Sequence, residues 1–478
     1  MAPSPKRKHG VTVNGIERGG FLCLVLIFVG PAIYILHFPS DPVHQPSSTP
    51  TLSGPVDLRA INFAWNGLDF SEDPPPIHLR IAVFCRKWPV SSSPGGMERH
   101  ALSLYSVLAK RGHRIHVFTS PVGGNVSADM PSLKVHFHEG EVGRWIASKA
   151  WEDFLEENKS EPFDVIHSQS VSLPNNLAKG MPNVVATWHG IALESLYSFI
   201  YQDFALRQEK EPFSPALSKS AAAIVPTIIK EIRFFNNYGQ HVAISDSCGE
   251  ILRNVYQIPS KRVHVILNGV SEDNYHMKDP RTASRFRSKR HIPENAIVAG
   301  VAGRLVKDKG HPLLFQAFSR IVKKYPNIYL VIAGSGPWGD RYRELGKNVH
   351  VLGPQNATQL GEFYSGIDVF VNPTLRPQGL DLTFMEAMMS GNPVLAPRYP
   401  SITGTLLVEE YFGFLFEPNV DSLEGALVAM AKEGREGLAE RGRAGWEYAK
   451  KMFGGRKMSL AYERLFLCIK DDKYCEFP

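Results

Sequence analysis

The chain has 478 residues, more than one ordinary hydrophobic core accommodates, and this length predicts two α/β domains with additional segments. Hydrophobic residues make up 43% of the sequence and charged residues 21%, a composition that excludes an intrinsically disordered chain. The 53 Lys and Arg residues are nearly balanced by 47 Asp and Glu residues, and no long basic run occurs, so a nucleic-acid partner is not expected.

The N-terminal segment predicts a membrane anchor. Residues 19–38 contain no Asp, Glu, Lys or Arg, and a helix of this length would rise by about 30 Å, the thickness of a bilayer core. Basic residues precede it, so the positive-inside rule places a tail of residues 1–18 in the cytosol. A cleaved signal peptide is the alternative, but the apolar run is longer than a usual signal and has no Ala-x-Ala site.

Residues 39–76 are rich in proline and serine and have no sustained period, which predicts a stem. Together these segments predict a type II, single-pass membrane protein, with the Golgi favoured and the endoplasmic reticulum as the alternative. Asn125, Asn158 and Asn356 begin acceptor triplets that would permit a glycoprotein in that location.

The five cysteines are scattered, with no Cys-x-x-Cys pair or histidine cluster, so a structural zinc site is not expected. Only Cys468 and Cys475 are close in sequence. They are either paired with each other or free.

The first domain is predicted over residues 77–270 and opens as a βαβ unit. An apolar strand, residues 79–85, is followed by a loop that carries Gly95 and Gly96 and by a helix over residues 97–110. Two adjacent glycines before a helix leave backbone N–H groups free to meet a phosphate or a hydroxylated substrate. An ordinary flexible loop is the alternative.

Later strands of this domain are predicted to end in polar residues. The apolar runs at residues 163–167, 184–188, 241–245 and 263–267 finish in or before His, Ser, Asp or Asn. An open parallel sheet places its ligand crevice at these carboxyl ends. His189, which follows the second of these runs, is therefore a candidate site residue.

Residues 271–293 predict an interdomain linker, and residues 294–455 a second domain. Its first strand, residues 297–302, leads to a loop with Arg304 and Lys309 before a helix. Both cations and the helix N-terminus could meet a diphosphate there, although a solvated basic loop is the alternative. Gly334 and Gly336 follow a later strand, and a helix and tail occupy residues 456–478.

The stretch from Pro373 to Pro397 predicts a loop, a short helix and another strand. Thr383 is a candidate N-cap, which places Glu386 in or near the first turn. In isolation, Thr383-x-x-Glu386 is equally the pattern of a capping box, in which each side chain bonds a backbone N–H of the other residue.

In their order along the chain, these motifs resemble the retaining glycosyltransferases of family four (glycosyl transferase group 1). Gly303-Arg304, Lys309-Gly310 and the Glu386-Ala-Met stretch before Gly391-x-Pro-Val match that family's signature. The resemblance covers approximately residues 79–470. It implies an α/β GT-B fold, in which two Rossmann-like domains face a cleft, with the last helix crossing back onto the first domain.

The resemblance also implies roles for site residues. Arg304 and Lys309 would bind the diphosphate, Glu386 the ribose and His189 the donor sugar. Gly95 and Gly96 would contact phosphate or acceptor through their backbone, and Gly334 and Gly336 would form the loop on the nucleotide side.

One position departs from the family pattern, because Gln378 stands where the first glutamate of the Glu-x7-Glu motif belongs. An amide is neither an anionic base nor a carboxylate that stabilises a cation. We hypothesise that Asp381 restores the negative charge of this loop. Asp381→Asn is then expected to abolish transfer and leave nucleotide binding nearly intact.

The implied reaction is transfer of a hexose from a UDP- or GDP-linked donor to a glycan, lipid or small-molecule acceptor, with retention of configuration. No Asp-x-Asp triplet is present, so neither a metal nor another cofactor is expected. A membrane-anchored sugar-nucleotide-binding protein without transferase activity is the alternative. A dinucleotide-dependent oxidoreductase is disfavoured, because no Gly-x-Gly-x-x-Gly follows an early strand.

Overall fold

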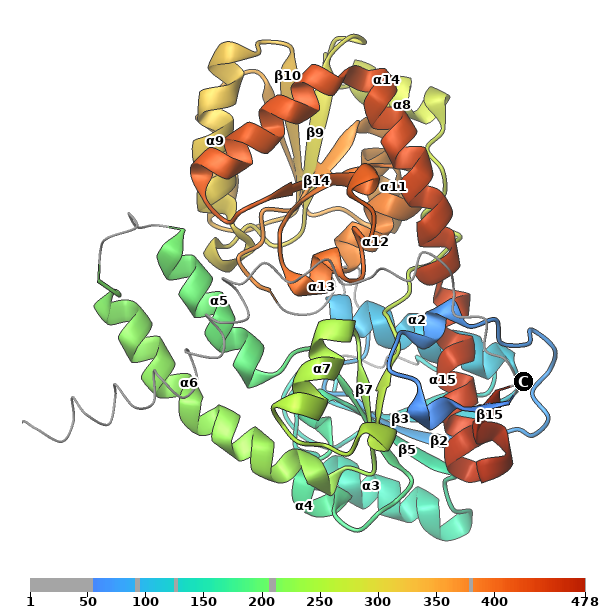
Figure 1. Ribbon diagram of the computed structural model, residues 1–478. Helices are drawn as coiled ribbons and strands as arrows, with labels where there is room; N and C mark the ends of the chain where they lie inside the picture. The colour runs from blue at the N-terminus through green and yellow to red at the C-terminus, as the bar shows by residue number, and fades with distance from the viewer. Residues whose placement is uncertain (1–54, 91–94, 124–127, 206–211, 378–380, 478) are drawn as a thin grey trace, which may run out of the picture. The chain divides into compact units, whose positions relative to one another are not determined.

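The structure is a computed structural model that describes residues 55–477, except for residues 91–94, 124–127, 206–211 and 378–380. The predicted tail at 1–18, the anchor at 19–38 and most of the predicted stem lie outside the described residues. Within the described ranges, no helix combines the length and apolar character that crossing a membrane requires. The described chain contains two parallel sheets with helices packed on their faces, the two-domain GT-B-like α/β fold that the motifs imply (Figure 1).

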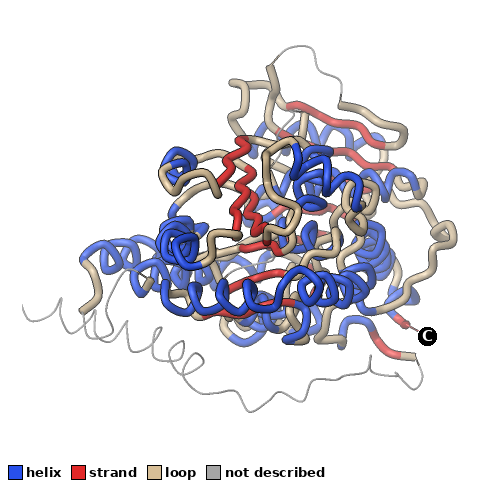
Figure 2. The backbone as a smooth tube through the Cα atoms, turned by 90° about the horizontal axis from the view of Figure 1, so that it is seen from above, coloured by secondary structure: helices blue, strands red, loops and turns tan. Residues whose placement is uncertain are grey.

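The first sheet has seven parallel strands in the order β4-β3-β2-β5-β6-β7-β8. The inner strands β2, β5 and β6 are buried along their whole length. Seen from above, the molecule has helices packed around its strands (Figure 2). The strands are β2 (Arg80–Phe84), β3 (Arg114–Thr119), β4 (Leu133–Phe137), β5 (Val165–Gln169), β6 (Val184–Trp188), β7 (Gln240–Ala243) and β8 (Val263–Val265). The helices are α2 (Gly96–Lys110), α3 (Ala147–Ser160), α4 (Asn175–Ala178), α5 (Ala192–Phe204), α6 (Pro215–Phe234) and α7 (Asp246–Asn254).

The second sheet has six parallel strands in the order β11-β10-β9-β12-β13-β14. The strands are β9 (Ile297–Ala302), β10 (Ile328–Ala333), β11 (Val349–Gly353), β12 (Val369–Val371), β13 (Val394–Pro397) and β14 (Gly413–Phe416). The helices are α8 (Pro280–Ser288), α9 (His311–Lys324), α10 (Trp338–Arg343), α11 (Ala357–Gly366), α12 (Leu382–Met389), α13 (Pro400–Thr403) and α14 (Val420–Met452). In both sheets the order reverses beside the first strand, β2 or β9, which is where such folds bind ligands.

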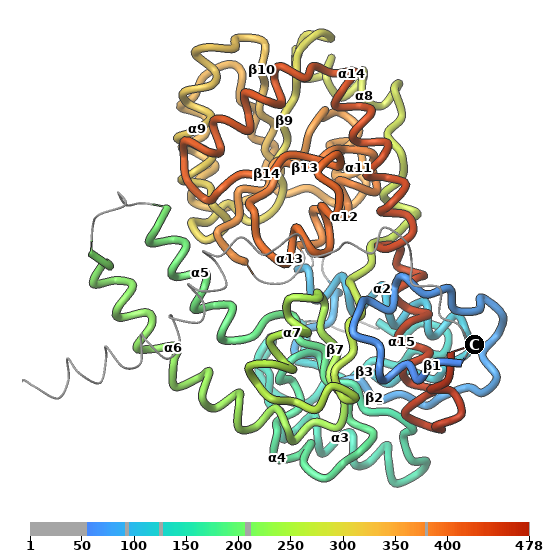
Figure 3. Tube along the Cα trace, in the orientation of Figure 1, coloured from blue at the N-terminus to red at the C-terminus, as the bar shows by residue number. Residues whose placement is uncertain are grey.

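The last helix, α15 (Gly455–Lys470), packs against the first domain beside α2 (Figure 3). Glu463 on α15 accepts hydrogen bonds from Arg111 at 2.7 and 2.8 Å and contacts the His113 ring at 2.8 Å. A disulfide joins Cys468 in α15 to Cys475 after it, and the short strand β15 (Glu476–Phe477) pairs antiparallel with β1 (Val56–Asp57). The C-terminus is thereby tied to the start of the described chain.

The chain passes between the two domains at two places that lie side by side. Val270, after β8, donates its N–H to Phe453 at 2.9 Å, and Gly455 donates its N–H to Val270 at 2.9 Å. The buried Asn66 amide joins the same two segments, because it donates to the carbonyls of Leu267 and Met452 at 3.3 and 2.9 Å. We call this junction the double crossing.

The structure corrects two details of the sequence interpretation. His167 does not end its strand, because β5 continues to Gln169 and the His167 ring is fully buried. The region expected to be a linker contains the helix α8, which Asp279 caps by accepting a hydrogen bond from the Thr282 N–H at 2.8 Å. The charged composition of α8 concealed its period, since only Phe286 and Arg287 of this helix are buried.

Candidate functional site

A cavity of about 490 Å³ lies where loops of the two sheets meet. The loop before α2 contributes Gly95 and Gly96, and the loops after β9 and β10 contribute Arg304, Lys309 and Gly334. Further lining comes from the loop after β12 and the first turn of α12. The structure therefore brings these five sequence-predicted site residues together around one cavity.

Helix N-termini surround this cavity. Gly96, the first residue of α2, and His311, the first residue of α9, both line it. So do Ala357 at the start of α11 and Leu382 at the start of α12.

The first turn of a helix carries backbone N–H groups without helical partners and a partial positive charge. The Gly95 N–H, expected to be free, is bonded to the Glu98 carboxylate, and the Gln359 N–H of α11 is bonded to Asn356. The other N–H groups of these first turns are available to an anionic ligand.

Gly334 and Gly336 make room for neighbouring backbone. Both have positive φ angles, 136° and 149°. A Cβ atom on Gly334 would lie 1.8 Å from the Gly303 carbonyl oxygen, and one on Gly336 would lie 2.5 Å from that of Leu305. These glycines therefore allow the loops after β9 and β10 to pack closely, and of the two only Gly334 lines the cavity.

Lys309 forms an ion pair with Asp381, and both residues line the cavity. The Lys309 ammonium lies 2.6 Å from each carboxylate oxygen of Asp381, and the Asn372 amide donates to the same carboxylate at 3.2 Å. Burial by itself would raise the pKa of Asp381, but the charge and hydrogen bonds of Lys309 lower it below the usual 3.8. The carboxylate that was expected to supply negative charge is thus neutralised by the cation that was expected to bind diphosphate.

Arg304 is exposed and lines the cavity, and no described residue forms a hydrogen bond or ion pair with its guanidinium. Its backbone is fixed by His311, whose Nε2 lies 3.2 Å from the Arg304 carbonyl oxygen, while Nδ1 lies 3.0 Å from the Tyr342 hydroxyl. Burial lowers the pKa of His311 to about 4, so the ring is neutral at pH 7. His311 therefore positions this loop without adding charge.

Glu386 is almost fully buried beneath the cavity. Its carboxylate is paired with Arg99 of α2 and accepts a hydrogen bond from the Tyr364 hydroxyl at 2.9 Å. The cap of α12 is Asp381, so the expectation that Thr383 caps this helix in a capping box with Glu386 is wrong. Glu386 lies in the second turn instead, where its side chain points into the protein interior.

His189 belongs to a buried polar network behind the first sheet's carboxyl end. The Gln169 amide nitrogen donates to the Tyr105 hydroxyl at 2.6 Å, which leaves the amide oxygen to accept from His189 Nε2 at 2.5 Å. The network continues through His167, Thr187 and Tyr462. The Tyr105 hydroxyl lies 2.9 Å from His167 Nδ1, and the Thr187 hydroxyl lies 2.8 Å from His167 Nε2. The hydroxyls of Thr187 and Tyr462 are 2.9 Å apart.

Burial lowers the pKa of His189 to about 4. The ring is therefore neutral at pH 7, with its proton on Nε2. His189 is half-buried, packs edge-on against the His100 ring at 4.7 Å and does not line the cavity.

Gln378 lies outside the described residues. Sequence reasoning missed Arg99, which lines the cavity and joins α2 to Glu386. The available signal was its position, because Arg99 follows the Gly95-Gly96 pair by one helical turn and thus faces the same space.

Two family models match the chain in tandem. Residues 94–274 match Glycosyltransferase Family 4, and residues 283–445 match Glycosyl transferases group 1. Among curated proteins, the lipopolysaccharide 1,2-N-acetylglucosaminetransferase of Salmonella typhimurium is 28% identical over 213 residues, which is 41% of this chain and 55% of that protein. The chain spans about half the length of the curated relatives that it matches, 38% to 56% for the first three.

Solved structures share the fold over most of the chain. Sucrose-phosphate synthase from Thermosynechococcus elongatus has a TM-score of 0.63 at 18% identity, over 82% of this chain and 98% of that one. The HepE protein of Anabaena, in complex with UDP-glucose, has a TM-score of 0.56 at 17% identity, over 81% of this chain and 99% of that one. At these identities the likeness establishes the fold.

The comparisons overturn the predicted location. The curated relatives are proteins of bacteria such as Salmonella typhimurium and Corynebacterium glutamicum and of the archaeon Methanocaldococcus jannaschii, organisms without a Golgi apparatus. The assignment to the Golgi as a type II membrane glycoprotein, which depended on residues 19–38 and on chance acceptor triplets, is therefore wrong.

Parallel sheets, an interdomain cavity lined by helix N-termini and two consecutive family matches lead to one assignment. The chain is built from a glycosyltransferase family 4 domain followed by a glycosyl transferases group 1 domain.

Proposed function

We propose that the protein is a glycosyltransferase that moves a hexose from a nucleoside-diphosphate donor to an acceptor hydroxyl, with retention of configuration and without a metal ion. The observation that carries the proposal is the cavity, in which Arg304, Lys309 and the N-termini of four helices surround one space. A diphosphate is the ligand whose size and charge suit such a set of donors.

The chemistry follows from charge. As the bond between the anomeric carbon and the diphosphate oxygen breaks, negative charge grows on the leaving group and the sugar becomes cationic. Donors that are already oriented stabilise that charge without reorganising, which is the largest single contribution in many enzymes. Arg304 is available to turn toward the phosphates, while the helix N-termini are fixed by the fold. The acceptor oxygen then attacks the face that the diphosphate leaves, and its proton passes to the departing diphosphate oxygen.

Asp381 acquires a role that differs from the one its sequence position suggested. Because both of its oxygens contact the Lys309 ammonium, we propose that Asp381 positions Lys309 for the diphosphate. Bound phosphate would then share the ammonium with Asp381. A substitution at Asp381 should consequently disturb donor binding as well as turnover.

We propose that Glu386 binds the ribose after its carboxylate exchanges its present partner for a ribose hydroxyl. In the structure its carboxylate is taken by Arg99 and Tyr364. Since Arg99 is partly exposed and lines the cavity, a ribose hydroxyl could replace it at the carboxylate. The proposed donors are UDP- or GDP-linked hexoses, and the proposed acceptors are a glycan, a lipid or a small molecule.

The test is nucleotide release by the purified full-length protein with a panel of UDP- and GDP-sugars and candidate acceptors. We expect release with one donor class and its loss in the Arg304→Ala/Lys309→Ala variant. Lys307→Ala is the matched control, because Lys307 is exposed in the same loop and does not line the cavity. Equal release by the wild type and the double variant would refute the proposal.

A binding protein without transferase activity is the second candidate. The pairing of Asp381 with Lys309 favours it, since the loop then has no free carboxylate at this position and Gln378 supplies only an amide. Tight nucleotide binding that depends on Arg304 and Lys309, without release across the acceptor panel, would select this candidate.

A further inference from the structure

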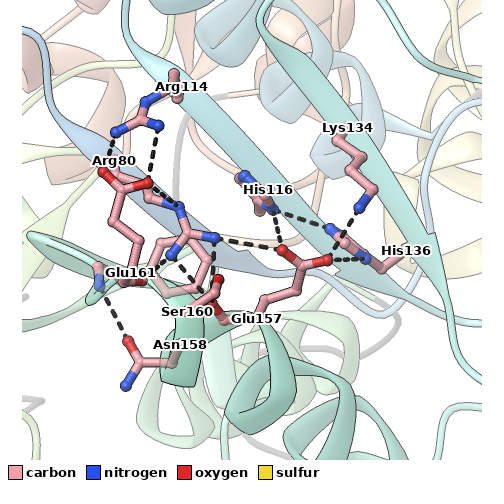
Figure 4. Close-up of polar contacts among 10 residues, drawn as sticks. Arg80, Arg114, His116, Lys134, His136, Glu157, Asn158, Ser160 and Glu161 are labelled. Carbon is pink, nitrogen blue, oxygen red and sulfur yellow. Dashed lines mark hydrogen bonds and ion pairs between the residues drawn. The ribbon is translucent and has the colours of Figure 1, made fainter.

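A cluster of metal-ligand side chains lies at the β4 edge of the first sheet, and none of its residues lines the cavity (Figure 4). His116 on β3 and His136 on β4 point to the same face of the sheet, because His116 pairs with Lys134 and His136 pairs with Phe118 in the parallel register. Glu157, near the end of α3, covers this face and meets both rings (Figure 4).

The three side chains converge on one point. His116 Nδ1 lies 3.0 Å from His136 Nε2 and 3.6 Å from a carboxylate oxygen of Glu157. One ligand atom from each residue falls within 4.8 Å of the other two. Zn²⁺ binds His nitrogen and carboxylate oxygen at about 2.0 to 2.2 Å, so tetrahedral ligand atoms lie about 3.3 Å apart. The His116 and His136 rings are hydrogen-bonded to each other, so an ion would replace that hydrogen bond with two metal–nitrogen bonds and draw the Glu157 carboxylate closer.

All three side chains are partly open to solvent. The side chains of His116, His136 and Glu157 keep 14%, 13% and 25% of their exposure. An ion can therefore enter from solvent, and water can take a fourth position.

Two cationic side chains, Arg80 and Lys134, contact the Glu157 carboxylate and would compete with a metal ion for it. Arg80 contacts one carboxylate oxygen at 3.3 Å, but its guanidinium also donates to the backbone carbonyls of Glu157 and Glu161 and lies 3.9 Å from the Phe163 ring centre. Arg80 is thus held independently of the carboxylate. Lys134 contacts the other oxygen at 2.9 Å and is 56% exposed, so it can move into solvent.

We propose that His116, His136 and Glu157 form a binding site for one divalent transition ion, with Zn²⁺ as the best match, and that the Lys134 ammonium occupies the carboxylate until the ion displaces it. Two imidazoles and one carboxylate are a ligand set that zinc accepts. The bound ion ties the edge strand β4 to α3. The site lies outside the cavity, so it is a structural site and takes no part in sugar transfer.

The test uses the full-length protein, freed of metal with a chelator and titrated with Co²⁺ as a spectroscopic probe. We expect one equivalent of Co²⁺ with tetrahedral absorption bands, displaced by Zn²⁺. His116→Ala and His136→Ala should each abolish this equivalent. His350→Ala should retain it, because His350 is a half-buried histidine on the edge strand β11 of the other sheet, stacked on Tyr329.

Two near-isosteric variants keep the test decisive if the alanine variants fail to fold. Lys134→Met should tighten Co²⁺ binding roughly tenfold by removing the competing charge. Glu157→Gln should weaken it at least roughly tenfold. Zn²⁺ should also raise the unfolding temperature of the wild type and His350→Ala, and not that of Glu157→Gln. Absence of a bound equivalent in the wild type, or one that persists unchanged in both histidine variants, overturns the proposal.

Discussion

The polar side chains on the two sides of the cavity differ in whether their hydrogen-bond partners lie within the protein. Behind the first sheet, His189, Gln169 and their neighbours bond one another in a closed network. On the second sheet, Arg304 extends into the cavity, and Lys309 has one carboxylate partner there. Polar side chains therefore hold the fold together on one side and remain available to a ligand on the other. Which role a polar side chain has depends on whether its partners lie within the protein.

The comparison predicts that losses on the second sheet appear in catalysis and losses on the first appear in stability. The largest effect is expected for Lys309→Met, which removes an oriented cation from the leaving group. Nucleotide release should fall by about 100-fold or more, while the unfolding free energy falls modestly because Asp381 loses its cation. Steady-state kinetics beside Lys307→Met measure this, and equal losses in both variants would contradict the assignment of Lys309.

Arg99→Met tests the contact that joins the two sides. It leaves the buried Glu386 carboxylate without its cation, so the free energy of unfolding should fall by about 2 kcal/mol. Urea denaturation provides the measurement. Arg343→Met, at an exposed arginine paired with Asp340 one helical turn away, should change it by less than about 0.5 kcal/mol. If Arg99→Met is as mild as this control, the pair contributes nothing to the fold.

Asp381→Asn should lower turnover by roughly tenfold and also change donor affinity, because Lys309 loses the partner that positions it. Donor binding by calorimetry and turnover by nucleotide release separate the two effects. Lost turnover with unchanged donor affinity would restore the earlier hypothesis, in which the Asp381 charge acts on the sugar.

Gln169→Leu should act on stability alone. It removes the acceptor of His189 Nε2 and the donor to Tyr105. Leaving these buried groups without partners should lower the free energy of unfolding by about 1 to 2 kcal/mol. Gln316→Leu, at an exposed position of α9, is the matched control. A Gln169→Leu protein of normal stability with impaired donor affinity would place this network in the donor site.

The last prediction concerns pH, and near neutral pH its effect on stability is small. Burial lowers the pKa of His167 and His241 to about 3, whereas the unfolded chain binds these protons near the usual value of 6.5. Stability is therefore complete above pH 6.5 and declines as the pH falls toward 3, by at most about 1.4 kcal/mol per pH unit for each histidine. Urea unfolding at several pH values measures the slope of unfolding free energy against pH. His241→Gln should reduce that slope by the contribution of about one proton.

Sequence patterns predicted the parts of the fold that depend on local periodicity. The strands at Val184–Trp188 and Ile297–Ala302 have the predicted limits, because buried parallel strands are uninterrupted apolar runs between polar loops. The helix α8 was missed, since its exposed face is basic and its apolar contacts are few. Local patterns carry no information about such tertiary burial.

The candidate site was predictable only where a motif fixes the backbone. Gly95, Gly96, Arg304 and Lys309 line the cavity because they precede helices or follow strands in a parallel fold. The partners of these residues were not predictable. Asp381 meets Lys309 from 72 residues away, and Arg99 meets Glu386 from 287 residues away, so nothing in either local sequence indicates these pairs.

The double crossing limits how the two domains can move. A single connecting segment would let one domain rotate freely against the other. Here backbone hydrogen bonds of Val270 with Phe453 and Gly455 join two segments, and the Asn66 side chain bonds to both. Two joined segments act as a hinge with a single axis, and they resist twisting of one domain against the other. Any opening of the cavity should therefore follow one direction, so that the loop before α2 returns to the same register against α12 after each departure.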